Sequence, residues 1–411
     1  MFEQIAQALA SLGLAVEPGA GQDALLGSSL VIIAGALLGE AVYRFLGLPR
    51  VVGYSLAGLG VAATGYGVAS GGAMSGTLRL VVDLALALLL FELGARVRLR
   101  WLKTNPFLLV TSLAESLLTF VAVYYTMRYF GLDVPSSAAL AVLAVPASPA
   151  VISRVASELG AEGQVTERVT LMAALNTLYG VFAARLLTAW LDLDQGQNPV
   201  RAIVEPLYVL VGSFIIAGLL GVGVARVARK LDLRNENSTL LLLGLIALAL
   251  ALTKVFGGST LLVPLMAGLW LRNTTERPWV WPRHFGTAGG VLVLLLFVIV
   301  GSSWSVEGLA VGGGLAIVAM LARFAGKGVA VLSLGWFSGQ SWRQGVGLSL
   351  ALTPLSATAL VMYADLQASH AGFASQLAPI ALSAIAMMEL IGALAVLVAL
   401  RGAGEIAARR T

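Results

Sequence analysis

Four ionisable side chains lie deep inside long apolar stretches of this 411-residue chain, and each is a candidate for chemistry: Glu115, Arg185, Lys327 and Glu389. A charge in an apolar medium is costly unless it is paired or hydrated, so such residues mark either a functional site or a structural ion pair, for example between Glu115 and Lys327. Carboxylates and a buried lysine can also gain and release a proton. We therefore take Glu115, Lys327 and Glu389 as candidates for proton coupling.

Uncharged oxygen-bearing side chains form a second set of candidates. Asn176 and Thr177 are polar neighbours in an otherwise apolar stretch, which indicates either hydrogen bonds between helices or the lining of a site. Ser148, Thr353 and Ser356 stand beside prolines in two further apolar stretches. Because such side chains offer oxygen ligands, we expect these five residues to contribute to a binding site for an ion or small solute.

Prolines interrupt two segments that are otherwise apolar enough to form transmembrane helices. Pro146 and Pro149 lie within 139–157, and Pro354 lies within 345–363. Proline removes a backbone donor and clashes with the preceding turn, and the freed carbonyl groups persist in a membrane only inside protein or around a cavity. A pair of broken helices, one in each half of a chain, indicates the binding site of a transporter.

The composition is that of an integral membrane protein: 58% of the residues are hydrophobic, 11% are charged, and the mean hydropathy is +0.90. Cysteine is absent and the only histidines are His284 and His370, so we expect no thiolate chemistry, no metal site and no cofactor. The sequence also lacks a recognisable set of nucleophile and base, which argues against an enzyme.

Lysine and arginine are concentrated in alternate loops, in four clusters at 96–103, 226–234, 272–283 and 401–410. This is the positive-inside pattern of membrane proteins, so we do not interpret the net charge of +5 as a nucleic-acid-binding surface. The pattern places the acidic segment 1–27 outside the cell and the tail 401–411 in the cytoplasm. Segment 1–27 lacks the basic region of a signal peptide.

Hydrophobic periodicity predicts an all-α membrane protein with about thirteen transmembrane helices. Their approximate ranges are 28–47, 51–68, 78–95, 106–129, 136–156, 168–190, 201–225, 238–254, 259–272, 286–302, 309–337, 344–366 and 376–400. The broken helices are the fifth and the twelfth, so an offset of seven makes them cross the membrane in opposite directions. Such an odd offset is typical of an inverted repeat.

Several short motifs together resemble the bacterial monovalent cation:proton antiporters of the CPA2 type. They follow the order of that family's helices over nearly all of 28–400, and each motif alone is weak. The matching segments are 48–54 (LPRVVGY), 88–94 (LLLFELG), 148–160 (SPAVISRVASELG), 257–259 (GGS) with 267–269 (AGL), 297–301 (FVIVG) and 326–327 (GK).

The resemblance implies one transmembrane domain over 28–400 that contains two kinds of helix. Helices at about 106–190 and 309–400 would form a mobile core. Helices at about 28–95 and 238–302 would form a dimerisation scaffold, and the seventh helix would link the two. The broken helices would cross near the midplane, and an elevator-like step of the core would exchange Na⁺ or K⁺ for protons. The resemblance also implies a homodimer in the bacterial inner membrane.

The chain departs from the family pattern at the residue that normally couples the two ions. The sixth helix of the family carries an aspartate, in an Asn-Asp or Asp-Asp pair, that binds the cation and exchanges the proton. The matching residues here are Asn176 and Thr177, and a threonine supplies oxygen without charge. The twelfth helix likewise has uncharged residues after Pro354, where the family often has Pro-Arg-Gly-Glu.

Three hypotheses are consistent with this departure. The chain is a cation antiporter whose acid has moved to Glu115 or Glu389. Alternatively, it transports another substrate on the same fold, and an anion is favoured if Lys327 lacks an acidic neighbour. The third hypothesis is a sensor or partner subunit that transports nothing.

Overall fold

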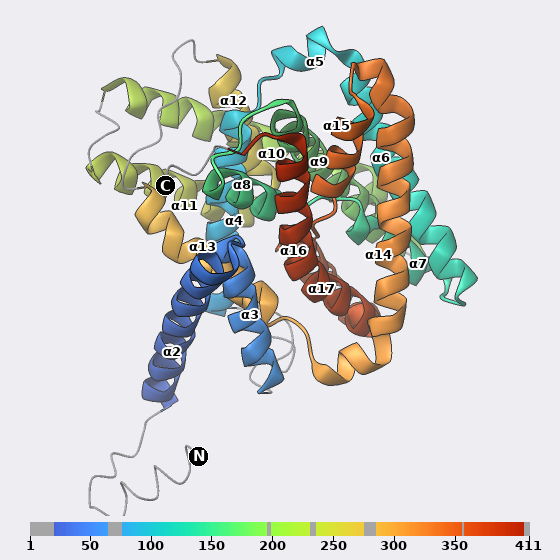
Figure 1. The fold of residues 1–411 in the computed structure, drawn as a ribbon, viewed down its shortest axis with the longest axis horizontal. Coiled ribbons are helices and arrows are strands. Elements are labelled where there is room, and N and C mark those ends of the chain that lie inside the picture. The colour runs from blue at the N-terminus through green and yellow to red at the C-terminus, as the bar shows by residue number, and fades with distance from the viewer. Residues whose placement is uncertain are drawn as a thin grey trace, which may run out of the picture.

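A computed structural model describes residues 20–64, 76–194, 199–230, 236–274, 285–355 and 357–406, and the regular elements in these ranges are all helical (Figure 1). The helices are α2 (Ala20–Ala41) with the π-helical turn η1 (Val42–Leu46), α3 (Arg50–Ala63), α4 (Gly76–Arg96), α5 (Arg100–Thr104), α6 (Pro106–Tyr129), α7 (Val134–Ala144), α8 (Pro149–Glu158), α9 (Gln164–Asp194), α10 (Pro199–Lys230), α11 (Glu236–Val255), α12 (Leu262–Thr274), α13 (Phe285–Gly301), α14 (Val306–Leu334), the 3-10 turn η3 (Gly335–Ser338), α15 (Trp342–Ala351), α16 (Ala357–Ser369) and α17 (Ala371–Ala403).

The described helices confirm the expectation of a multi-pass membrane protein. Seven segments in the described residues are long and apolar enough to cross a membrane, and 50–63, 240–255 and 289–301 are shorter apolar helices. Each of the thirteen expected helices has a counterpart, and the two expected to be broken are the pairs α7–α8 and α15–α16. The first helix begins at Ala20, earlier than expected, whereas residues 1–19 and 407–411 lie outside the described part.

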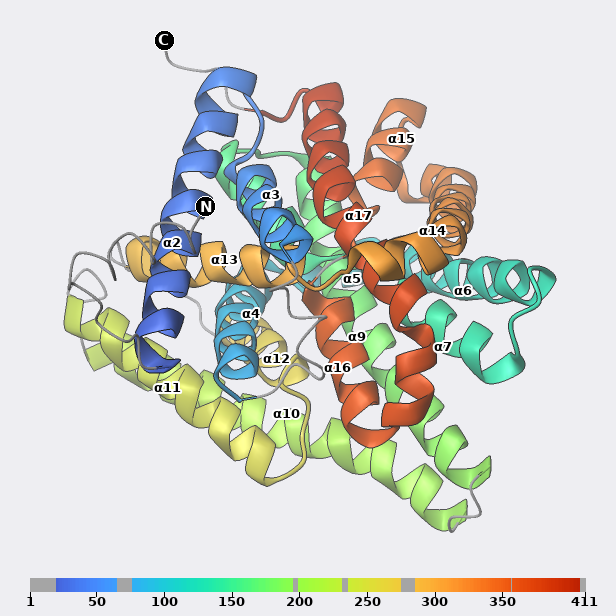
Figure 2. The same cartoon turned by 90° about the horizontal axis from the view of Figure 1, so that it is seen from below.

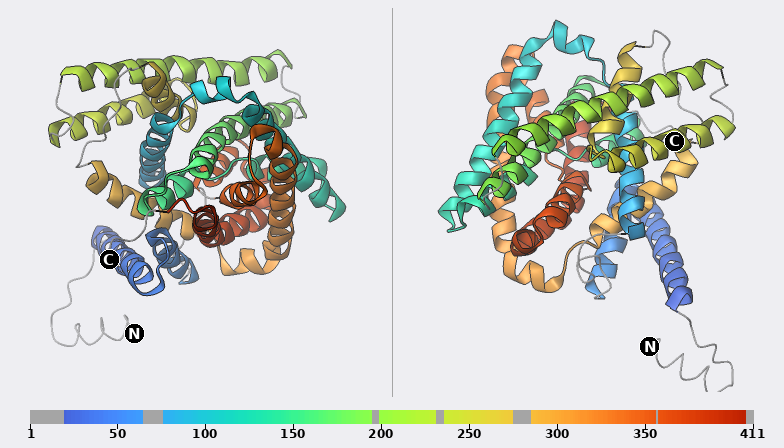
Figure 3. Two further views of the ribbon diagram at one scale, coloured as in Figure 1. Left: turned by 45° about the horizontal axis from the view of Figure 1, so that its top comes forward. Right: turned by 180° about the vertical axis from the view of Figure 1, so that it is seen from behind.

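The helices form two groups, which lie on different sides of the bundle in two perpendicular views (Figures 1 and 2). We call α6–α9 with α14–α17 the crossing group, in which α14 packs on α6 and on α17. We call α2–α4 with α11–α13 the flanking group, in which α12 packs on α4 and α13 packs on α3. The long helix α10 contacts α9 of one group and α12 of the other, and it runs along the outside of the bundle (Figure 3).

Contacts between neighbouring helices show which helix termini lie together at each end of the bundle. At the first, which we call the basic end, the contacts are Arg401–Gly47, Arg50–Glu158, Leu99–Asn273, Asn105–Ser338 and Arg168–Ser338. At the second, the opposite end, they are Arg79–Asp365, Lys254–Asp83, Arg185–Asp365 and His370–Asp192. Successive long helices alternate between these ends, as expected for a chain that crosses a membrane repeatedly.

Candidate functional site

The two broken helices meet at their breaks. The helix α7 ends at Ala144, and α8 restarts at Pro149, where a missing N–H costs nothing. Ser148 caps α8 by accepting a hydrogen bond from the Val151 amide at 3.4 Å. The Ser148 amide donates to the Pro354 carbonyl of the second break at 2.8 Å. The prolines therefore break both helices where they contact each other, as the sequence predicts.

Arg323 of α14 supplies hydrogen bonds to the carbonyl groups that the breaks leave free. Its buried guanidinium donates to Ala144 O at 2.8 Å and to Thr353 O. It also donates to the carbonyls of Pro146, Leu352 and Pro354 at 3.0, 3.3 and 3.2 Å. Peptide carbonyls buried without a donor are costly, so one fixed cation stabilises both breaks. No sequence motif marks Arg323 as a site residue.

Lys327, one turn beyond Arg323 on α14, forms an ion pair with Glu115 of α6. Both side chains are 0% exposed, and the Lys327 ammonium also donates to the Val145 carbonyl at 3.0 Å, within the first break. Gly326 permits this arrangement, since a Cβ there would meet the α6 backbone at Leu118 and Thr119 within 3.0 Å. The anion hypothesis required that Lys327 have no acidic neighbour, but Glu115 is such a neighbour.

Asn176 of α9 completes a polar cluster around the Glu115–Lys327 pair. Its side-chain amide nitrogen donates to Glu115 Oε1 at 3.4 Å. Its amide oxygen accepts hydrogen bonds from Ser116 at 3.1 Å and from Ser112 at 3.4 Å. The cluster brings together a carboxylate, an ammonium, an amide and two hydroxyls, which can hold a small cation or transfer a proton.

Thr177 and Thr353 lie near the crossing, and each hydroxyl donates a hydrogen bond within its own segment. The Thr177 hydroxyl donates to Ala173 O of its own helix at 2.8 Å, and the Thr353 hydroxyl donates to Ser349 O at 3.3 Å. Both hydroxyl oxygens keep lone pairs that can coordinate a cation or accept a hydrogen bond. Ser356 lies outside the described residues.

The prolines of the two breaks pack against glycines of neighbouring helices. A Cβ on Gly180 of α9 would stand 3.0 Å from the Pro146 ring, and one on Gly392 of α17 would stand 2.8 Å from Pro354 Cα. These glycines allow α9 and α17 to approach the breaks closely.

Glu389 of α17 is fully buried, as expected, but it lies where the two groups of helices meet. It accepts a hydrogen bond from the Ser55 hydroxyl of α3, in the flanking group, at 3.4 Å. Glu115 rather than Glu389 is therefore the carboxylate that contacts Lys327 and Asn176.

A chain of ion pairs joins the two groups at the opposite end. Asp83 of α4 contacts Lys254 of α11 at 2.8 Å and Arg79 of α4 at 3.0 Å. Arg79 also reaches Asp365 of α16 in the crossing group at 2.7 Å, and Asp365 lies 3.9 Å from Arg185 of α9. Arg185 therefore pairs with Asp365 at the opposite end of the bundle, and it is not part of the polar cluster at the crossing.

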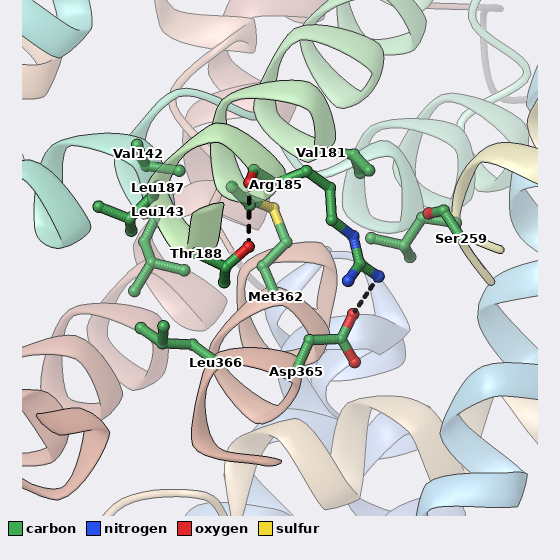
Figure 4. A pocket seen from close by; sticks show the side chains of 12 residues that line it. Val142, Leu143, Val181, Arg185, Leu187, Thr188, Ser259, Met362, Asp365 and Leu366 are labelled. Carbon is green, nitrogen blue, oxygen red and sulfur yellow. Dashed lines mark hydrogen bonds and ion pairs between the residues drawn. The ribbon is translucent and has the colours of Figure 1, made fainter. Parts of the chain in front are cut away.

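Two cavities lie between the groups, one toward each end. At the opposite end a cavity of about 30 Å³ is lined by Arg185, Asp365 and Ser259, and Figure 4 shows Arg185 directed at Asp365. At the basic end a cavity of about 730 Å³ lies between the C-terminal ends of α4 and α12 and the start of α9. Of these two cavities, the one at the basic end is the larger.

Comparison with known proteins gives a consistent family relationship. The sequence profile of the family described as "Sodium/hydrogen exchanger, transmembrane" matches residues 31–401. The Na⁺/H⁺ antiporter ApNhaP of Aphanothece halophytica is 25% identical over 281 residues, which are 65% of this chain and 53% of that protein. The alignment with this curated relative thus spans about half of its length.

Two solved structures of the sodium proton antiporter MjNhaP1 from Methanocaldococcus jannaschii share the fold. One, determined at pH 8, has a TM-score of 0.66 with 14% identity, over 92% of this chain and 95% of that one. The other, from electron microscopy, has a TM-score of 0.71 with 16% identity, over 93% and 96%. The relatives are named as antiporters, which are transporters and not enzymes, as expected. Because the family profile covers nearly the whole helical bundle, this chain belongs to the sodium/hydrogen exchanger family.

Proposed function

We propose that the chain exchanges a monovalent cation, Na⁺ or K⁺, for protons, and that the cation competes with protonated Lys327 for the Glu115 carboxylate. The observation that carries the proposal is the buried Glu115–Lys327 pair, which lies against the first break and is surrounded by Asn176 and Ser116. This arrangement supplies, on α6, the carboxylate that the Asn176-Thr177 sequence lacks on α9.

The pair supports a simple exchange of charge. Without a bound cation, the Lys327 ammonium neutralises Glu115. A cation that binds Glu115 brings a second positive charge beside one carboxylate, and in a buried site this repulsion is strong. Lys327 then releases its proton, so one positive charge leaves as another enters. Asn176 Oδ1 and the hydroxyls of Ser112 and Ser116 supply further oxygens for the dehydrated cation.

We infer an elevator-like step of alternating access, which the division into two groups of helices supports. We assign the crossing group as the mobile core, the flanking group as the scaffold and α10 as the linker. The contrast between the cavities of about 730 and 30 Å³ supports this step, since a shift of the core would open one end while closing the other. The ion pair between Arg79 and Asp365 would break in that step.

The orientation and assembly belong to the same proposal. The basic end faces the cytoplasm, because it carries the arginine-rich segment 96–103 and Arg272, and the N-terminus is then outside. The homodimer and the bacterial inner membrane are inferred from the family resemblance. No feature of the polar cluster favours an anion over a cation, because Lys327 is neutralised by Glu115.

Transport by purified protein in proteoliposomes tests the proposal. Wild-type protein should move protons in response to Na⁺ or K⁺, and Glu115→Gln should abolish this movement. Asp192→Asn is a matched control, since it removes a carboxylate of α9 that contacts His370 at the opposite end. Normal exchange by Glu115→Gln would refute the assignment, and loss of exchange in Glu389→Gln alone would transfer the role to Glu389. A stable partner complex without any flux would support the sensor hypothesis instead.

A further inference from the structure

The cavity at the basic end has a strongly cationic wall on its flanking side. Four arginines line the cavity, Arg96, Arg98, Arg100 and Arg272, and Glu162 and Glu167 lie on its other side. Arg96 pairs with Glu92 at 2.5 Å. In the part of the chain that the structure describes, the other three arginines have no carboxylate partner within ion-pairing distance. Three guanidinium groups are thus available around one cavity.

The segment that carries these arginines is held in a fixed position. The Asn273 side chain, next to Arg272 at the end of α12, accepts a hydrogen bond from the Leu99 amide at 2.8 Å. The same side chain donates to the carbonyls of Val97 and Leu269 at 3.1 and 2.8 Å. Because one asparagine ties the two arginine-bearing segments together, the positions of their backbones are set before any ligand binds. Such preorganisation lowers the cost of binding.

The opposite wall of the cavity, at the start of α9, carries the carboxylates Glu162 and Glu167. Glu405, which follows α17, accepts hydrogen bonds from the amides of Val165 and Thr166 at 2.7 and 2.8 Å. It also accepts one from the Thr166 hydroxyl at 2.8 Å. The first turn of α9 therefore has its own carboxylate, and the cationic side chains of the cavity lie on the flanking wall.

We propose that this cavity binds an organic phosphate through Arg98, Arg100 and Arg272. Guanidinium groups match the oxygens of a phosphate in paired hydrogen bonds, which makes arginine well suited to this group. A volume of about 730 Å³ exceeds what a single inorganic phosphate requires and lies in the range of sites for organic ligands. Trp101 adds apolar surface for the rest of the molecule.

Two sources can supply such a phosphate at the cytoplasmic surface: the headgroup of an anionic phospholipid and a soluble nucleotide. The effect on transport rests on the function proposed above. The cavity has one wall in each group of helices, so it must narrow when the core moves toward the opposite orientation. A ligand that fills it prevents this narrowing and slows exchange.

Ligand-induced stabilisation of purified protein against thermal unfolding tests the site without any transport. The probes are ATP, pyrophosphate and short-chain phosphatidylglycerol at constant ionic strength, with short-chain phosphatidylcholine as the uncharged-headgroup control. The variant Arg98→Gln/Arg272→Gln should bind the active probe about tenfold more weakly or worse than wild type. Arg343→Gln is the matched control, because Arg343 lies exposed in the first turn of α15 and does not line the cavity.

The outcomes separate the alternatives. Binding of ATP alone identifies a soluble ligand, and binding of phosphatidylglycerol alone identifies a lipid; both support the site. Equal stabilisation of wild type and the double variant, or no stabilisation by any phosphate compound, overturns it. In proteoliposomes the active probe should slow exchange by wild type and leave the double variant unaffected. Binding without slowing overturns the effect on transport, whereas wild type that exchanges no ions contradicts the proposed function and leaves the binding result intact.

Discussion

The ion pair between Arg79 and Asp365 should hold the core against the scaffold at the opposite end, and Asp365→Ala removes it. Arg79 keeps its second partner, Asp83 at 3.0 Å, so the substitution does not leave Arg79 unpaired. The Asp365 side chain is 41% exposed and the contact with Arg185 is long, at 3.9 Å. Solvent screening therefore limits the lost interaction to about 1 kcal/mol. This amount shifts the equilibrium between the two orientations of the core by about fivefold.

Chemical labelling measures that shift directly, because the natural chain contains no cysteine. Ser259 lines the narrow cavity beside Asp365, so a single Ser259→Cys substitution reports on how often this cavity opens. The rate of reaction with a polar maleimide should rise about fivefold when Asp365→Ala is added. Asp192→Ala is the control, since its partner His370 lies in the same group of helices. An unchanged rate with Asp365→Ala, or an equal rise with Asp192→Ala, would refute the proposed role of the pair.

Three further predictions concern residues that hold the helices around the site in place. Arg323→Met should lower the free energy of unfolding by at least about 3 kcal/mol, because five buried carbonyls lose their donor. Thermal unfolding measures this loss, and Arg343→Met at the surface should have little effect. Gly326→Ala should impair exchange in proteoliposomes by forcing α14 away from α6, while Gly328→Ala, whose Cβ meets no atom within 4 Å, should not; equal effects would contradict the close packing. Glu405→Ala should cost about 1–2 kcal/mol of stability by exposing the first amides of α9, and unchanged thermal unfolding would count against this cap.

Local sequence signals predicted the architecture well. Prolines at 146, 149 and 354 located both breaks, because proline acts on its own backbone and on the preceding turn. The predicted helix 106–129 coincides with α6, which starts at Pro106 and ends before Gly131, the latter with φ of +89°. The short helix α5 and the turn η3 were not predicted, since neither is long enough to show a periodic pattern.

The side-chain contacts within the site could not be predicted, because they depend on how distant helices pack together. Glu115 and Lys327 are 212 residues apart, so their pairing was only one of several possibilities for buried charges. Arg323 could not be identified as a site residue, because the sequence does not show which face of α14 meets the breaks. The ion pairs around Asp83 and Asp365 join four helices and likewise follow from tertiary structure alone.

Competition between cation and proton in a binding experiment tests the role of Glu115 most directly. The affinity of purified protein for radioactive Na⁺ should weaken as the pH falls. The change should approach tenfold per pH unit where one proton competes with one cation for the site. The Glu115→Gln variant should lose this pH dependence together with most of the binding. Cation binding by Glu115→Gln with the same affinity and the same proton competition as wild type would contradict the proposed mechanism.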